Sequence, residues 1–270
     1  MPKSSFYQDK LLTNEKANTL LASRSACVVQ ETVDFLTSLS KKERQNMEQH
    51  GFSFATLFNN IACSSLNENH LQYILEKICQ QWDTWHTDVS FEKYHPLHNA
   101  LRYGNFLLFD TMITYGVDPT CFSYPLHPTE PFHLLDSAVR CRLTSDIQEK
   151  ATDKAIFSCP FDAKQKQDAL VNALHQGNLG AVKSLMKHNA RFLTQGLATE
   201  MLTLSCSIKP SDTVFELVQQ LLKDERVLKS AQENLPSRRS TPLHQAAYEG
   251  NTLVLELLLE HGANINAPNL

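Results

Sequence analysis

Glycine and proline are scarce in this chain of 270 residues, which contains eight glycines and eleven prolines. Folds built mainly from β-strands need many tight turns, and these two residues supply most of them. Their scarcity therefore favours helices. The seven cysteines are odd in number and form no C-x-x-C pair, which argues against a disulfide framework and a structural zinc site. We expect a reducing compartment, and hence a cytoplasmic location.

Long apolar runs and a strong charge of one sign are also missing. No apolar stretch follows Lys3 near the N-terminus, and nowhere do about 18 apolar residues run together. We therefore expect neither a Sec signal peptide nor membrane insertion. The formal net charge of −4 at pH 7 gives no global basic field, so we expect no nucleic-acid partner.

Sequence motifs for phosphate or metal binding are absent as well. The chain contains no G-x-x-x-x-G-K, no G-x-G-x-x-G and no H-E-x-x-H, and no set of cysteines and histidines has zinc spacing. We expect no cofactor, no bound metal and no catalytic residue within residues 1–270.

A repeated pattern takes the place of such motifs. Its clearest copy, at 241–267, reads TPLHQAAYEGN followed by TLVLELLLEHGANINA. Similar stretches occur at 96–105 (PLHNALRYGN) and at 169–178 (ALVNALHQGN), each followed by an apolar segment. Three matched copies indicate an internal repeat, and a repeat of this length is typical of a stacked architecture.

Weaker copies follow when the anchor is a leucine that is followed, after two residues of any type, by a small residue and then an apolar one. The anchor leucines are then Leu57, Leu97, Leu135, Leu170, Leu202 and Leu243. Their spacings are 40, 38, 35, 32 and 41 residues. Most of the five or six units therefore carry insertions relative to a period of about 33 residues.

The copy at 241–267 resembles an ankyrin repeat. It has the T-P-L-H-x-A-A-x-x-G opening, the V-x-x-L-L-L second helix and the G-A-x-x-N-A exit of that family. The resemblance implies an all-α solenoid of antiparallel helix pairs over 51–270 that binds another protein. Helical patterns at 15–21, 28–39 and 40–51 predict that residues 1–50 form an N-terminal helical cap.

Each part of the clearest copy has a physical role. Thr241 is suited to cap the first helix, and Pro242 to its first turn. The pair of alanines at 246 and 247 allows the two helices to approach closely, and Gly250 ends the first helix. Gly262 supplies a left-handed exit from the second helix. We expect a stripe of leucines at 253, 257 and 258 to be buried against neighbouring repeats.

The resemblance also implies where a partner binds, because ankyrin repeats use variable positions of the first helix. Arg and Tyr are among the residue types that contribute most to interfaces. We expect the partner-binding residues to be Asn99, Arg102, Tyr103, Ser137, Arg140, Asn172, His175, Gln176, Gln245, Tyr248 and Glu249.

Asn266 is a predicted modification site. A leucine, Leu258, stands eight residues before this asparagine in the exit loop. The arrangement resembles the substrates of the asparaginyl hydroxylase that modifies ankyrin repeats in animal cells. We therefore expect hydroxylation of Asn266.

Several residues permit a catalytic interpretation as well as a structural one. His98 and His244 occupy the histidine position of the repeat opening, which favours a structural role. Cys141, next to Arg140 and Arg142, and Cys159 are candidate nucleophiles, although buried cysteine is the common alternative. The charged segment 223–240 is expected to be a solvated loop.

Three functions are compatible with this pattern. The favoured one is a protein–protein interaction module, a scaffold or targeting surface. Its irregular repeats resemble those of the ankyrin-repeat effectors that intracellular bacteria deliver into host cells, which implies secretion without a Sec signal peptide. The first alternative is the recognition or regulatory half of a larger enzyme whose catalytic domain lies after residue 270. The second is a small catalytic insertion within 120–165 around Cys141 or Cys159.

Overall fold

The structure is a computed structural model, and it describes residues 26–40, 42, 54–64, 66–81, 96–119, 124–127, 130–132, 134–141, 143–232, 240–266 and 268. The chain divides into two compact units, Met1–Ser137 and Ala138–Leu270. The predicted boundary between the cap and the repeats, at residue 50, lies outside the described residues and stays a prediction. The predicted helix at 15–21 lies outside them too, as does most of the one at 40–51.

The first unit contains α2 (Ala26–Ser38), α4 (Phe54–Cys63), α5 (Glu68–Gln81), α7 (Pro96–Arg102) and α8 (Phe106–Thr114). Helix α4 packs against α7, and α5 packs against α8, so like helices of successive pairs stack on one another. Val29 and Val33 are buried on α2, which confirms the amphipathic helix predicted at 28–39. The last helix, α9 (Leu134–Arg140), contains the division between the units.

A short pair of strands follows α8. Strands β1 (Tyr124–His127) and β2 (Glu130–Phe132) are antiparallel, with Tyr124 opposite Phe132 and His127 opposite Glu130. The all-α prediction is confirmed for the packed layers, which consist of helices. The strand pair lies in the connection between Leu97 and Leu135, where the spacing of anchor leucines exceeds the ankyrin period and leaves room for it.

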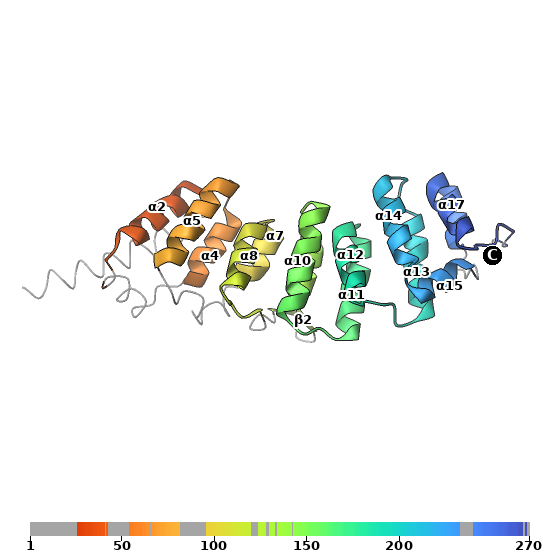
Figure 1. Cartoon of the computed structure of the whole chain (residues 1–270), viewed down its shortest axis with the longest axis horizontal. Coiled ribbons are helices and arrows are strands. Elements are labelled where there is room, and N and C mark those ends of the chain that lie inside the picture. The colour runs from red at the N-terminus through yellow and green to blue at the C-terminus, as the bar shows by residue number, and fades with distance from the viewer. Residues whose placement is uncertain are drawn as a thin grey trace, which may run out of the picture. The chain divides into compact units, whose positions relative to one another are not determined.

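The second unit is a stack of helix pairs. After α10 (Ser145–Ser158) come the pairs α11 (Ala163–His175) with α12 (Leu179–Lys187), α13 (Gln195–Cys206) with α14 (Asp212–Leu221), and α16 (Pro242–Tyr248) with α17 (Thr252–Glu260). Helices α11, α13 and α16 pack in succession and form the first-helix row. Helices α10, α12, α14 and α17 form the second-helix row in the same way (Figure 1).

The anchor leucines confirm the predicted repeat. Each of the six is buried, with at most 8% of its surface exposed, and they lie on α4, α7, α9, α11, α13 and α16, at 57, 97, 135, 170, 202 and 243. The connection between paired helices is also repeated, as a glycine with positive φ followed by an asparagine that caps the second helix. Gly250, at φ 69°, and Asn251 make this connection in the last pair. The left-handed backbone explains why glycine is used there.

Three of the described second helices, α8, α12 and α17, are followed by a residue of positive φ, and one of these residues is not glycine. Gly262 has φ 92°, which confirms the predicted left-handed exit, and Gly116 has φ 85° at the matching position. Asn189 occupies this position after α12 with φ 62°. Asparagine tolerates the left-handed region better than other side chains do, so the exit keeps its geometry without glycine.

Two details of the last repeat were predicted wrongly. Leu253 is 51% exposed, and the buried stripe of α17 consists of Val254, Leu257 and Leu258. Leu253 and Val254 both lie about one helical turn before Leu257, so spacing alone does not separate them, and the packing of α17 against α14 buries the side of Val254. Ala247 is exposed, so Ala246 alone makes the close helix contact. The predicted cap is confirmed, since the Thr241 side chain accepts a hydrogen bond from the His244 N–H.

The connection before the last repeat contains a helix where a solvated loop was expected. Helix α15 (Glu225–Gln232) packs against α13, with Val227 and Ala231 buried. The Asp224 carboxylate caps it by accepting hydrogen bonds from the N–H groups of Arg226 and Val227. Apolar residues four positions apart make one face of this charged segment suitable for burial. Residues 233–239 of the segment lie outside the described part of the chain.

Candidate functional site

The predicted partner-binding residues of the second unit lie along the first-helix row. Counted from the anchor leucine, they are the second, fifth and sixth following positions of α11 and α16. His175 and Gln176 are exposed at the end of α11, and Tyr248, at the end of α16, is 84% exposed. Asn172, Gln245 and Glu249 are half-buried beside them. Side chains from two different repeats are therefore presented on the same helix row.

Helix α13 lies between α11 and α16 and supplies three further residues that the sequence prediction missed. Leu204, Ser207 and Ile208 occupy its second, fifth and sixth positions after the anchor, and all are half-buried. The anchor Leu202 was recognised, and the same counting would have found them. We define the first-helix surface as the nine residues Asn172, His175, Gln176, Leu204, Ser207, Ile208, Gln245, Tyr248 and Glu249.

The first unit presents its own exposed residues at matching positions of α7. Arg102 is exposed, and Tyr103 is 52% exposed. Asn99 is half-buried, and its Nδ2 donates a hydrogen bond to Asn59 Oδ1 on α4 at 2.6 Å. Asn99 therefore also joins two adjacent repeats, whereas Arg102 and Tyr103 are available for external contacts.

Ser137 corrects the predicted list. Only 7% of its surface is exposed, and its Oγ lies 2.6 Å from His98 Nδ1. The imidazole of the preceding repeat covers this short side chain, which removes it from any partner surface. Arg140, three residues further along α9, is exposed as predicted.

The repeat histidines take part in structural hydrogen bonds. His98 is buried and contacts Ser137, while His244 Nδ1 lies 2.8 Å from the Oγ1 of the N-cap residue Thr241. The His98 ring thus joins α7 to α9, and the His244 ring contacts the residue that begins α16. These contacts support the structural interpretation of both histidines.

Cys141 and Cys206 do not have the surroundings of nucleophiles. Cys141 is buried and its thiol donates a hydrogen bond to the Ala138 carbonyl at 2.9 Å, and burial raises the pKa of the thiol to about 11. Cys206 is buried on α13, where burial raises its thiol pKa to about 12. Because the thiolate is the reactive form, both thiols are poorly suited to attack a substrate. Cys159 is half-buried at the end of α10.

The catalytic insertion considered for 120–165 is not supported by the packing of this segment. Residues 145–158 form α10, which packs against α12 as a regular member of the second-helix row. Ala151 and Ala155 are fully buried on it. Helix α10 is thus part of the stack.

A carboxylate on α10 ties it to α12. Asp153 Oδ1 accepts hydrogen bonds from Ser184 Oγ at 2.7 Å and from His188 Nε2 at 2.9 Å, and its Oδ2 lies 3.1 Å from Lys187 Nζ. Burial opposes ionisation of this carboxyl, but the three hydrogen bonds together outweigh it and lower the pKa of Asp153. Phe157 stacks edge-on against His188 with ring centroids 4.9 Å apart.

We expect this cluster to make stability depend on pH. A carboxyl whose pKa is lowered by folding stabilises the protein above its unfolded pKa, near 4, and that contribution is lost as the pH falls through the folded value. At neutral pH, Asp153→Asn should lower the free energy of unfolding by about 1 kcal/mol. Urea unfolding from about pH 7 to about pH 3 measures the difference.

The matched control for this prediction is Asp168→Asn, which changes an exposed carboxylate on α11. The difference in the free energy of unfolding between wild type and Asp153→Asn should become smaller as the pH falls. Asp168→Asn should have nearly the wild-type free energy of unfolding at neutral pH. A difference that is constant with pH would show that Asp153 acts only through packing.

Asn266 lies in an exposed turn after α17. Its backbone N–H donates to Asn264 Oδ1 at 2.9 Å, and Leu258, eight residues earlier, is fully buried in α17. The asparagine side chain is thus on the surface. Its hydroxylation stays a prediction from the resemblance.

Metal-binding clusters and membrane-spanning helices are both absent from the part of the chain that the structure describes. Three or more His, Cys, Asp or Glu side chains nowhere gather there in a way that would hold a metal ion. Within the same residues, no helix combines the length and the apolar character needed to cross a bilayer.

Comparison with known protein families gives a match for the C-terminal part of the chain. A family model described as Ankyrin repeats, in three copies, matches residues 170–269. The match runs from within α11 to the loop after α17 and includes the whole first-helix surface. No curated protein matches the chain.

Proposed function

Residues 170–269 belong to the ankyrin-repeat family, a class of protein–protein interaction modules, and we propose that the first-helix surface is where they bind a partner protein. The surface comprises residues of α11, α13 and α16, which pack in succession. Its backbone is held by helix caps and by buried leucines, so the side chains are presented in a fixed arrangement. A preformed surface loses little entropy when a partner binds.

The observation that carries the proposal is the exposure of Tyr248. This ring is 84% exposed at the end of α16, although tyrosine in a folded protein usually buries much of its ring. Tyrosine is enriched among the residues that dominate binding energy, because it combines a large apolar area with few rotatable bonds. His175 and Ile208 are at the corresponding ends of α11 and α13 and extend the area that a partner would cover.

The proposal predicts that Tyr248→Ala weakens binding without unfolding the protein. Removing a central aromatic side chain of an interface typically costs about 2 kcal/mol, or roughly a thirtyfold loss of affinity. Proteins captured from a eukaryotic lysate by the wild-type chain would be identified by mass spectrometry. The best candidate would then be purified and its Kd measured against wild type and variants.

Phe157→Ala is the matched control for Tyr248→Ala. Phe157 is 76% exposed and loses a ring of similar size, but it lies on α10 in the second-helix row. The Kd should rise with Tyr248→Ala and stay unchanged with Phe157→Ala. Equal affinities for both variants would place the partner on another surface.

A finer proposal concerns the partner's origin. We propose that it is a protein of a host cell, as the irregular repeats of this chain resemble those of delivered bacterial effectors. A partner recovered from eukaryotic lysate but not from bacterial lysate supports this assignment. None of the described residues favours the alternative in which the repeats serve a catalytic domain encoded after residue 270.

A further inference from the structure

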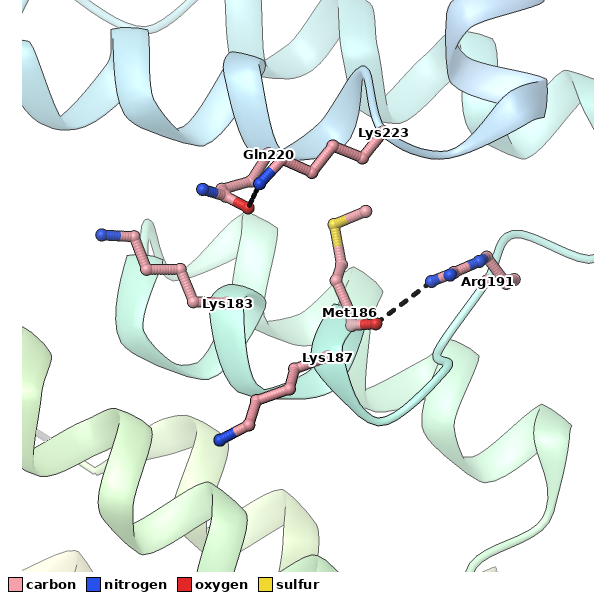
Figure 2. Close-up of a pocket in the computed structure, with 6 residues that line it drawn as sticks. All are labelled: Lys183, Met186, Lys187, Arg191, Gln220 and Lys223. Atoms are coloured by element: carbon pink, nitrogen blue, oxygen red, sulfur yellow. Dashed lines mark hydrogen bonds between the residues drawn. The ribbon is translucent and has the colours of Figure 1, made fainter.

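A basic pocket lies in the second-helix row, away from the residues of the first-helix surface. It occupies about 220 Å³ between α12 and α14, and its lining consists of Lys183, Met186, Lys187, Arg191, Gln220 and Lys223. Figure 2 shows the Met186 side chain pointing from α12 toward α14, with Lys183 on one side of it and Arg191 on the other. Four of the six lining residues are cations, and none is an acid.

The carboxylates near these cations lie outside the lining. Lys183 Nζ contacts Glu216 Oε2 at 2.7 Å, and Lys187 Nζ contacts Asp153 Oδ2 at 3.1 Å. These pairs are solvent-exposed on at least one side, and such ion pairs contribute only about 0–1 kcal/mol. Lys183 can therefore turn toward another anion at little cost, whereas Lys187 also takes part in the cluster around Asp153.

Of the other two cations, Lys223 bonds a neutral group and Arg191 lies near a buried carboxylate. Lys223 Nζ donates to the neutral Gln220 Oε1 at 2.8 Å. Arg191 Nε lies 3.8 Å from Asp224 Oδ2, which is beyond hydrogen-bond distance. Arg191 Nη1 donates to the carbonyls of Met186 and Ala190, which holds the guanidinium at the edge of the pocket.

Helix ends alone do not explain this concentration of positive charge. Lysines near the C-termini of helices offset the macrodipole, and both α12 and α14 end beside the pocket. Each helix end contributes only about half a negative charge, roughly one in total. Four cations exceed that amount, and Lys183 lies a full turn before the end of α12. Carboxylates lie near Lys183, Lys187 and Arg191, so the positive charge left for an anion comes from Lys223, which bonds a neutral amide, and from Lys183, whose ion pair with Glu216 is partly exposed.

We propose that this pocket receives a phosphorylated side chain of a partner protein. A phosphomonoester carries about −1.5 to −2 charges near pH 7 and has three acceptor oxygens. Donor groups line the pocket on two sides, with Lys183 and Arg191 on the α12 side and Gln220 and Lys223 on the α14 side, while the Lys187 ammonium is turned away toward Asp153. A planar carboxylate has two oxygens and uses fewer of these donors. Met186 and the aliphatic lysine stems provide contacts for the carbon atoms that join the phosphate to a peptide.

The test uses two degenerate peptide libraries that differ only in a central phosphothreonine or threonine. We expect the immobilised full chain to retain the phosphorylated library and not the other. The double substitution Lys183→Gln with Lys223→Gln should reduce retention about tenfold, because two charge-assisted hydrogen bonds are lost. Retention should also fall as salt is raised, since the lysines are solvent-accessible.

Lys164→Gln with Lys209→Gln is the matched control, because it removes the same charge from exposed lysines outside the pocket. Circular dichroism of all variants confirms that they are folded. Equal retention of both libraries, or equal loss with the control pair, would overturn the proposal. So would binding confined to inorganic phosphate or to phosphoinositide vesicles. Tyr248→Ala should leave retention of the phosphorylated library unchanged, so this site and the first-helix surface are tested separately.

Discussion

Replacing Gly180 with alanine should lower the free energy of unfolding of the second unit by about 2–3 kcal/mol. A Cβ at this position of α12 would lie 2.0 Å from the Ser145 carbonyl oxygen and 2.9 Å from the Glu149 nitrogen. Both atoms belong to the backbone of α10, so no side-chain rotation relieves the contact. The two helices must separate, and the buried face between them loses its close packing.

Gly196→Ala is the control, because Gly196 also lies in a helix but a Cβ added to it would meet no atom of the described residues within 4 Å. Alanine there should stabilise the protein by about 0.5 kcal/mol. Glycine gives the unfolded chain more conformational freedom than alanine does, so folding of the alanine variant loses less entropy. Urea unfolding of wild type and both variants measures the difference. If the two alanine variants are equally stable, α10 and α12 do not approach as closely as described.

Asn178→Ala should lower the free energy of unfolding by about 2–4 kcal/mol. The Asn178 side chain caps α12 by accepting from the Ala181 N–H at 3.0 Å, and its Nδ2 donates to the Val139 carbonyl of α9 at 2.7 Å. The variant loses both bonds and leaves the Val139 carbonyl without this donor. Asn178 is 4% exposed, so water does not readily replace them.

Asn251 provides an internal comparison for this prediction. It caps α17 by accepting from the Val254 N–H at 3.2 Å, but its buried Nδ2 has no hydrogen-bond partner among the described residues. Asn251→Ala removes only the capping hydrogen bond, so it should lower the free energy of unfolding by about 1 kcal/mol. Aspartate retains the cap, removes the amide donor and adds a buried charge at both positions, so Asn178→Asp should destabilise the protein more than Asn251→Asp does, because it alone also loses the Val139 bond. Equal costs at the two positions would contradict a role for the Val139 bond.

The sequence contains enough local signal to predict the repeats and their turns. Glycine at a left-handed position and an asparagine after it are short-range requirements, so they recur wherever the fold repeats them. The anchor leucines were found for the same reason, because each is buried on its own helix. These features depend on residues within one repeat.

The features that were missed depend on contacts between repeats. Ser137 is buried because His98 of the preceding repeat covers it, and the sequence of α9 alone does not show this. Leu253 and Val254 are adjacent apolar residues, and only the orientation of α17 against α14 decides which is buried. Helix α15 was missed because its charges concealed two buried residues that face α13.

The basic pocket could be predicted from the sequence only in part, because it combines residues of one repeat with residues of the next. Lys183, Lys187 and Arg191 are spaced four residues apart, which is a visible pattern for one side of a helix and its extension. Gln220 and Lys223 come from the next repeat, and their approach to α12 follows only from the stacking of α12 and α14. The spacing of the first three could have suggested a basic stripe, but not a pocket.

The stacking of like helices also decides how far a local opening spreads within the second unit. In the second-helix row, α12 contacts α10 on one side and α14 on the other. Opening α12 therefore exposes the faces of two neighbours in the row. Cooperativity in such an array is transmitted from neighbour to neighbour, so amide protons of α12 exchange with solvent only when both of these interfaces are disturbed. The basic pocket between α12 and α14 thus shares the local stability of two interfaces.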